Sequence, residues 1–179
     1  MYPEKIKKLM ESLLSSSLKA LQTDYIDIML VHNVSKTETI ANETVMEFLR
    51  SIKKKGIIRA HGFSSHNEIE LLKFANESKF YDIIMNPYNH KGAYVHMMSG
   101  SKLEWDQPAL EIELKKAHKN NMGIISMKTC SGGPYPAADG EEPSFAGAIK
   151  WVLDKEYVHA AAVAMANLRQ IKENVIAMI

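Results

Sequence analysis

The chain has 179 residues, 46% of them hydrophobic, and a net charge of +1, which is typical of a globular domain and gives no electrostatic case for nucleic acid as a partner. No apolar run reaches the roughly 20 residues of a membrane helix, so we expect no membrane partner either. Cys130 is the only cysteine and the polar N-terminus does not resemble a signal peptide, so we expect a cytoplasmic protein without disulfides or a cysteine-bound metal.

Apolar periodicity predicts one helix, residues 4–21, followed by five strand–helix units in a single domain over residues 1–179. The predicted strands are residues 25–31, 57–63, 82–85, 123–127 and 160–165. The helices after them are residues 43–55, 66–77, 108–120, 144–154 and 167–179, with Asn42, Ser65, Ser144 and Asn167 as expected caps. The intervening loops 86–106 and 129–143 are long enough to suggest a functional role.

The first strand carries the first candidate functional residue. Residues 26–31 are apolar except for Asp27, a pattern that favours a strand buried on both faces, and they are followed by His32 and Asn33. Because chemistry in parallel α/β proteins sits at the carboxyl ends of strands, His32 is a candidate site residue. A buried histidine bonded to a backbone carbonyl is an equally good interpretation.

Polar residues also follow the other strands, where a parallel sheet would gather them along one rim and form a ligand site. The residues concerned are Ser64, Ser65, His66, Asn86, Tyr88, Asn89, Met127, Lys128, Met165 and Asn167. Each has a structural alternative: helix caps for Ser65 and Asn167, turn residues for Asn86 and Asn89, core for Met127, and a solvated side chain for Lys128.

The chemistry of these strand ends favours hydrogen bonds to a carbonyl or carboxamide. Hydroxyls, amides, an imidazole and a lysine suit such a ligand, whereas a hard metal ion would need clustered carboxylates, so we expect no metal. A triad of Ser64, His32 and Asp27 is disfavoured because Asp27 lies in mid-strand and no nucleophile elbow is present.

Four segments resemble the aldo/keto reductase family, in the family's order and spacing. They are residues 12–32, which end in "TDYIDIMLVH"; residues 54–65, "KKGIIRAHGFSS"; residues 121–128, "NMGIISMK"; and residues 167–174, "NLRQIKEN". The Met127-Lys128 and Ser64-Ser65-His66 variants are most similar to a bacterial branch of predicted oxidoreductases. The resemblance implies an α/β fold, a TIM (β/α)8 barrel in the family, of which this chain matches units four to eight and the preceding helix. We therefore expect an N-terminally truncated, partial barrel.

The resemblance also assigns roles to individual residues. His32 would orient the substrate carbonyl as the catalytic histidine. The cofactor, NADP or NAD, would be bound by Ser64, Ser65, Asn86, Met127, Lys128, Gln170, Glu173 and Asn174. Among these, Ser64, Ser65 and Asn86 would hold the nicotinamide carboxamide, Met127 would replace a stacking tyrosine, Gln170 stands at the 2′-phosphate position, and Glu173 and Asn174 would contact adenine.

The family's catalytic aspartate, tyrosine and lysine have no counterpart in this sequence. We therefore expect an oxidoreductase fragment from a family that reduces carbonyls with NAD(P)H, acting on a small carbonyl substrate if it is active. The alternative is an inactive remnant or interaction module that retains only the fold. Open apolar edges at strands 25–31 and 160–165 predict self-association or a missing N-terminal half as partner.

Overall fold

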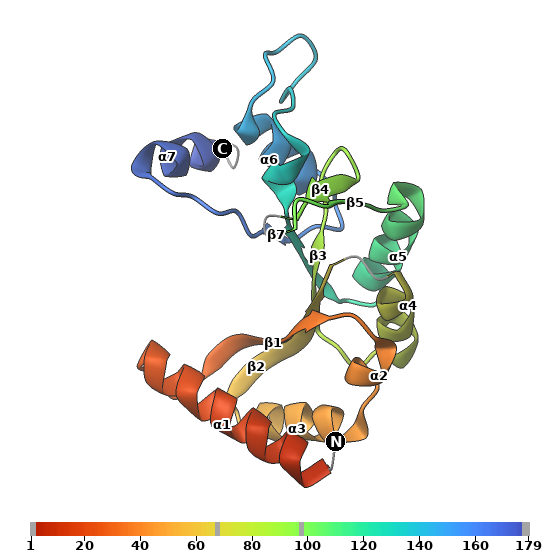
Figure 1. Ribbon diagram of the computed structural model, residues 1–179, viewed down its shortest axis with the longest axis vertical. Helices are drawn as coiled ribbons and strands as arrows, with labels where there is room; N and C mark the ends of the chain where they lie inside the picture. The colour runs from red at the N-terminus through yellow and green to blue at the C-terminus, as the bar shows by residue number, and fades with distance from the viewer. Residues whose placement is uncertain (1–2, 67–68, 97–98, 177–179) are drawn as a thin grey trace. The chain divides into compact units, whose positions relative to one another are not determined.

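A computed structural model describes residues 3–66, 69–96 and 99–176, and Figure 1 shows its ribbon. The chain divides into two compact units, Met1–Ile84 and Met85–Ile179, which are described separately below. No helix within the described ranges is long and apolar enough to cross a membrane.

The first unit contains the first two strands and the start of the third. Its elements are α1 (Pro3–Leu21), β1 (Ile26–Val34), α2 (Thr37–Ile40), α3 (Glu43–Lys54), β2 (Ile58–Ser65), α4 (Ile69–Ser78) and the first residues of β3 (Ile83–Pro87). β1 pairs with β2 in parallel, with Ile26 opposite Ile58 and Val31 opposite Phe63. The Asn42 side chain caps α3 by accepting a hydrogen bond from the Val45 N–H at 3.3 Å, as predicted.

Helices α3 and α4 supply about half of the buried apolar residues of the first unit's core, and β2 and the segment before β3 contribute to the rest. The buried apolar residues there include Phe48, Leu49, Ile52, Phe63, Leu71, Leu72 and Tyr81. The Tyr81 hydroxyl donates to the Ile40 carbonyl at 2.6 Å, and burial raises the pKa of that phenol. The side chain of Asp82 accepts hydrogen bonds from Lys53 Nζ at 2.6 Å and from the His61 N–H at 2.9 Å. This carboxylate therefore joins α3, β2 and the segment before β3.

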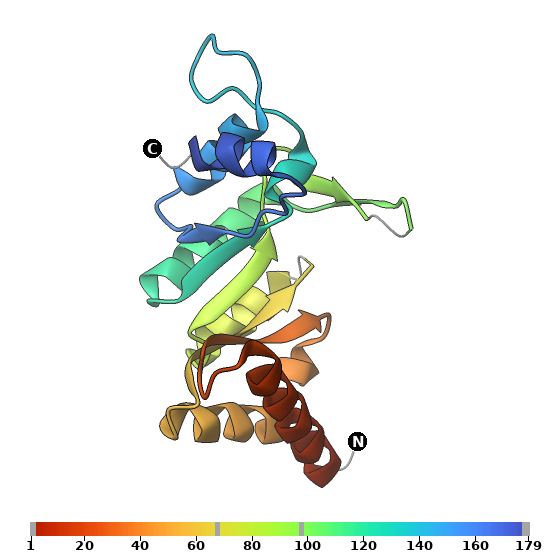
Figure 2. The ribbon, with the colours of Figure 1, turned by 90° about the vertical axis from the view of Figure 1, so that its left-hand side faces the viewer.

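The second unit contains the rest of β3 and the remaining elements. These are β4 (Ala93–Val95), β5 (Lys102–Glu104), α5 (Gln107–Lys119), β6 (Gly123–Met127), the 3-10 helix η1 (Thr129–Gly132), α6 (Phe145–Leu153), β7 (Ala160–Ala161) and α7 (Leu168–Ile176). The strands β3, β6 and β7 are neighbours in that order, and β7 pairs with β6 in parallel. Strands β4 and β5 form an antiparallel hairpin, which Figure 2 shows as an arm of this unit.

The α/β class and the order of predicted elements are confirmed, but three details were wrong. Only Val34 is buried in β1, and Ile28 is 41% exposed, so this strand is not covered on both faces. The segment 86–106 is not a plain loop, because it contains the β4–β5 hairpin. The last strand covers residues 160–161 and not 160–165. The predicted capping box at Ser65 involves residues 67 and 68, which lie outside the described residues.

Candidate functional site

His32 lies near the end of β1 with an exposed side chain, so the interpretation as a buried histidine is wrong. The register between β1 and β2 shifts between Val31 and Val34, and Asn33 within this irregularity has a φ of 53°. The Asn33 N–H donates to Ser64 Oγ at 2.9 Å. This bond ties the strand residue next to His32 to β2 and leaves the imidazole open to a ligand.

The two serines at the end of β2 are both buried, with 3% exposure at Ser64 and none at Ser65. Because Ser64 Oγ accepts from Asn33, its own proton is still available for donation. A triad with Asp27 is not formed. Asp27 Oδ1 instead pairs with Arg59 Nη1 at 2.7 Å, and an odd separation in a strand directs Asp27 and His32 towards opposite faces.

In the second unit, Asn86 is a strand residue and not the turn residue considered above. It is 1% exposed, and neither its Nδ2 nor its Oδ1 has a hydrogen-bond partner. Along β3, the buried Ile84 and Asn86 alternate with the partly exposed Ile83 and Met85. A buried polar group without a partner costs about 1–3 kcal/mol, so this amide points to a partner that the folded chain does not supply.

Lys128 follows β6 and has a left-handed backbone, with φ 57° and ψ 21°. Its carbonyl accepts a hydrogen bond from Asn89 Nδ2 at 3.0 Å, and its ammonium lies over the Tyr94 ring, 5.5 Å from the centroid. Lys128 is therefore not simply a solvated side chain, since its side chain packs on the β4 strand. Met127 before it is partly exposed, at a position that alternates with the buried Ser126.

Asn89 is a site residue that sequence reasoning treated only as a possible turn residue. It is fully buried, and its side chain bonds the Ala93 carbonyl, the Lys128 carbonyl and the Lys91 N–H at 2.9–3.0 Å. Its position after a strand was the one available signal. The bonds to Lys91 and Ala93 are local, but the bond to the Lys128 carbonyl joins segments that are distant in sequence, so no local pattern reveals it.

His90 and Cys130 lie in the same two loops without forming a reactive pair in the structure. Burial lowers the pKa of His90, with a further contribution from the Lys91 charge, and its Nδ1 is buried without a partner. Burial raises the pKa of the Cys130 thiol, which disfavours the thiolate needed for nucleophilic chemistry. No group of His, Cys, Asp and Glu able to hold a metal occurs among the residues that the structure covers.

The three candidates on α7 are Gln170 in its first turn and Glu173 and Asn174 in its second half. The Asn167 side chain caps α7 by accepting from the Gln170 N–H at 3.0 Å, as predicted. Gln170 Oε1 in turn accepts from the Ala166 N–H at 2.6 Å, and Glu173 pairs with Arg169 at 3.6 Å. Asn174 lines an apolar cavity of about 480 Å³ with residues of α6, β7 and the segment after β7. The polar groups of Gln170 and Glu173 are thus engaged locally.

Comparisons with known proteins agree on one family. The sequence model of the "Aldo/keto reductase family" matches residues 3–146. A curated relative, methylglyoxal reductase DkgB from Salmonella typhi, is 29% identical over 57% of this chain and 45% of its own length. The chain therefore spans about half the length of this relative.

Solved structures show the same fold. The holo form of aldo-keto reductase AKR11C1 from Bacillus halodurans has a TM-score of 0.75 at 20% identity, covering 96% of this chain and 59% of that one. A putative aldo-keto reductase from Pseudomonas aeruginosa has a TM-score of 0.67 at 25% identity, over 92% and 55% of the two chains. A Klebsiella pneumoniae aldo/keto reductase in complex with NADP and acetate has a TM-score of 0.60 at 16% identity, over 94% and 59%. The chain belongs to the aldo/keto reductase family.

Proposed function

We propose that this chain is the cofactor-binding part of an oxidoreductase that reduces a small carbonyl compound with NADPH or NADH. The family match supports the reaction class. Two of the structural neighbours, described as a holo form and as a complex with NADP, support a nicotinamide cofactor. The chain covers only 59% of each of these neighbours, so the activity of a whole enzyme is part of the proposal.

The unpaired amide of Asn86 is the observation that carries this proposal. Its Nδ2 and Oδ1 are shielded from water, and neither has a partner in the protein. A nicotinamide carboxamide offers one acceptor and one pair of donors, so it could bond both groups of the Asn86 amide. Because both atoms are closed off by the chain, binding requires local opening around β3. The resemblance assigns the same task to Ser64 and Ser65, and Ser64 still has a proton to donate.

When bound, the cofactor would supply the hydride, and His32 would contribute a hydrogen bond to the carbonyl oxygen. Reduction also requires a positioned acid that delivers a proton to this oxygen. Since the family's aspartate, tyrosine and lysine have no counterpart, we expect cofactor binding without turnover by this chain alone. An inactive remnant that retains only the fold is the competing proposal, and it predicts no nucleotide binding at all.

We further propose that the chain associates with a second copy or with an N-terminal half through its apolar edge. Leu9 and Leu13 on α1 are 52% and 56% exposed, and Ile28 on β1 is 41% exposed, in the first unit. Such a surface favours association. The single cysteine supports a location in the reducing cytoplasm.

A titration of NADPH against the purified chain tests the proposed function. We expect a saturable change in NADPH fluorescence, at least a tenfold weaker affinity for Asn86→Leu, and no change for Ser16→Ala on the exposed surface of α1. Parallel circular dichroism establishes that each variant is folded. Absence of any saturable change with the native chain would favour the inactive remnant.

A further inference from the structure

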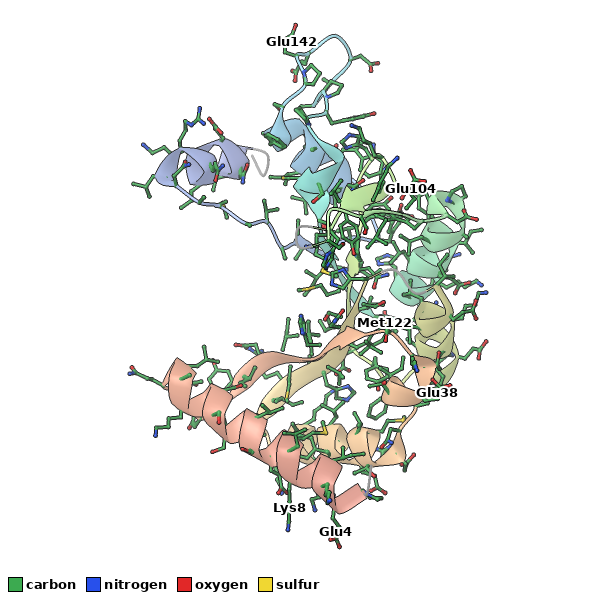
Figure 3. The ribbon with its side chains drawn as sticks, in the orientation of Figure 1. Glu4, Lys8, Glu38, Glu104, Met122 and Glu142 are labelled. Atoms are coloured by element: carbon green, nitrogen blue, oxygen red, sulfur yellow. The ribbon has the colours of Figure 1, made fainter. Side chains whose placement is uncertain are left out.

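A histidine joins the start of β7 to the start of β6 in the second unit. The His159 N–H donates to the Ile124 carbonyl at 2.9 Å, and the Ile124 N–H donates back to His159 Nδ1 at 3.0 Å. Figure 3 labels Met122, which lies between α5 and β6 at this end of the strand. His159 thus holds Ile124 through its backbone and through its imidazole, directly before the first paired residue of β7.

The bond to Ile124 determines which nitrogen of the His159 imidazole carries the proton. A backbone N–H can only donate, so Nδ1 must keep its lone pair, and the neutral ring has its hydrogen on Nε2. A protonated ring would have hydrogen on both nitrogens, and Nδ1 would then face the Ile124 N–H as a second donor. The bond therefore exists only while His159 is neutral. The same arrangement leaves no ring lone pair for a metal ion.

The surroundings of His159 offer no ion pair that would compensate for the lost bond. The ring of His118, in the last turn of α5, lies 5.3 Å away between centroids, and β6 has no charged residue. Neither imidazole has a carboxylate within 4.0 Å among the residues that the structure describes. The cavity of about 480 Å³ beside His159 is lined by α6, β7, the segment after β7 and α7, and none of its other lining side chains is titratable.

Strand β7 has few other bonds to β6. Only Ala160 and Ala161 pair with that strand, and the Ala162 N–H adds a bond to the Ser126 carbonyl at 2.8 Å. The described sheet ends on β7, so no bonds from a further strand support it. Alanine side chains also bury little apolar area. The imidazole bond is therefore a large share of the interactions that hold this edge strand.

Helix α7 is attached to the sheet through the same strand. Figure 1 shows that an extended segment, residues 162–167, leads from β7 to α7. The 480 Å³ cavity lies between α7 and its neighbours, with Leu153 of α6 and Val175 of α7 among the lining residues. Leu168 and Ile171 of α7 are 75% and 41% exposed, so the helix is only partly packed. We therefore expect the position of α7 to depend on the pairing of β7.

We propose that His159 is a pH-sensitive switch, in which uptake of a proton breaks the bond to Ile124 and releases β7, and α7 with it, from β6. Histidine is the side chain that ordinarily changes charge between about pH 5 and pH 8. The pairing is intact at the upper end of this range and opens as the pH falls. The candidate cofactor residues on α7 would be displaced by this opening. That consequence rests on the proposed function, but the switch itself does not.

The test measures hydrogen exchange of backbone amides by NMR in the 15N-labelled native chain, from pH 8 to pH 5 and without cofactor. Protonation of His159 is followed by its ring Cε1–H signal, which is assigned by its absence in His159→Asn. We expect the protection factors of the Ile124 and Ala162 amides to fall at least tenfold as the His159 ring becomes protonated. The Tyr88 amide, which donates to the Met127 carbonyl on the β3 side of β6, should keep its protection and is the internal control.

Two variants separate His159 from the other groups that titrate in this range. In His159→Asn, Oδ1 takes the place of Nδ1 as the acceptor but does not titrate, so the Ala162 amide should stay protected down to pH 5. In His159→Phe the ring has no acceptor, so this amide should exchange rapidly at pH 8 as well.

Two outcomes would overturn the proposal. One is unchanged protection of the Ala162 amide in the native chain while His159 becomes protonated. The other is an equal loss of protection in His159→Asn, because another group would then be responsible. Since no cofactor is present, a failure of the chain to bind NADPH would refute the proposed function and leave this result unaffected.

Discussion

Replacing Asn86 by leucine should stabilise the protein, although it removes a buried polar residue. Both side-chain atoms of Asn86 lack partners at 1% exposure, so the folded state bears their desolvation without a compensating bond. Leucine is close in shape to asparagine and has no such requirement. An unsatisfied group of this type costs about 1–3 kcal/mol, so the free energy of unfolding should rise by about that amount. For a chain of this length the melting temperature should rise by about 2–4 °C per kcal/mol.

Asn89→Leu is the matched control, because it changes the same residue type at a fully buried position nearby. Asn89 makes three hydrogen bonds to backbone groups, which the substitution would leave unpaired. We expect a loss of about 3 kcal/mol or more, at about 1 kcal/mol or more per bond. Urea unfolding followed by circular dichroism measures both values. A loss of stability in Asn86→Leu as large as that in Asn89→Leu would refute the reasoning, because it would mean that Asn86 serves the fold and not a ligand.

Three further predictions concern the packing and the surface. Burial lowers the pKa of His61 below 6.5. The neutral imidazole therefore stabilises the fold above pH 6.5, and this contribution is lost as the pH falls through the lowered pKa. Thermal melts from pH 7.5 to pH 5 should show a smaller decline of the melting temperature for His61→Gln than for the native chain. Tyr88→Phe should cost about 1–3 kcal/mol in urea unfolding, because it removes the 2.7 Å bond from the Tyr88 hydroxyl to Glu111 and the buried 2.7 Å bond between the hydroxyls of Tyr88 and Tyr157. An unchanged midpoint would contradict this. Light scattering after size exclusion should show a species larger than 20.2 kDa that Leu13→Lys with Ile28→Lys converts towards monomer, whereas a native monomer at micromolar concentration would exclude self-association.

Local signals predicted the elements well because the interactions that define them are local. The caps at Asn42, Ser144 and Asn167 each accept from an N–H three residues later, a relation that the sequence alone contains. The β4–β5 hairpin escaped prediction because each of its strands has only three residues, too few for a reliable period of two. The succession of strands and helices along the chain followed from the spacing of apolar residues in the sequence.

Burial and polar pairing depend on the tertiary structure, and there the sequence was less informative. The apolar run at β1 predicted a strand covered on both faces, yet Ile28 is 41% exposed, because periodicity cannot tell whether a covering layer is present. Asn86 and Asn89 are the same residue type, three positions apart, and both follow an apolar run. One has no partner and the other has three, since the partners of Asn89 include the distant Lys128. Only the fold separates a candidate ligand group from a structural one.

The most direct test of the central claim is the affinity of the native chain for NADPH, measured by the change in NADPH fluorescence. If this aldo/keto reductase chain binds the cofactor through Asn86, the fluorescence change should saturate with NADPH. The affinity should be at least tenfold weaker in Asn86→Leu, although that variant should unfold at a higher urea concentration than the native chain. A folded native chain that leaves NADPH fluorescence unchanged at every concentration would contradict the claim.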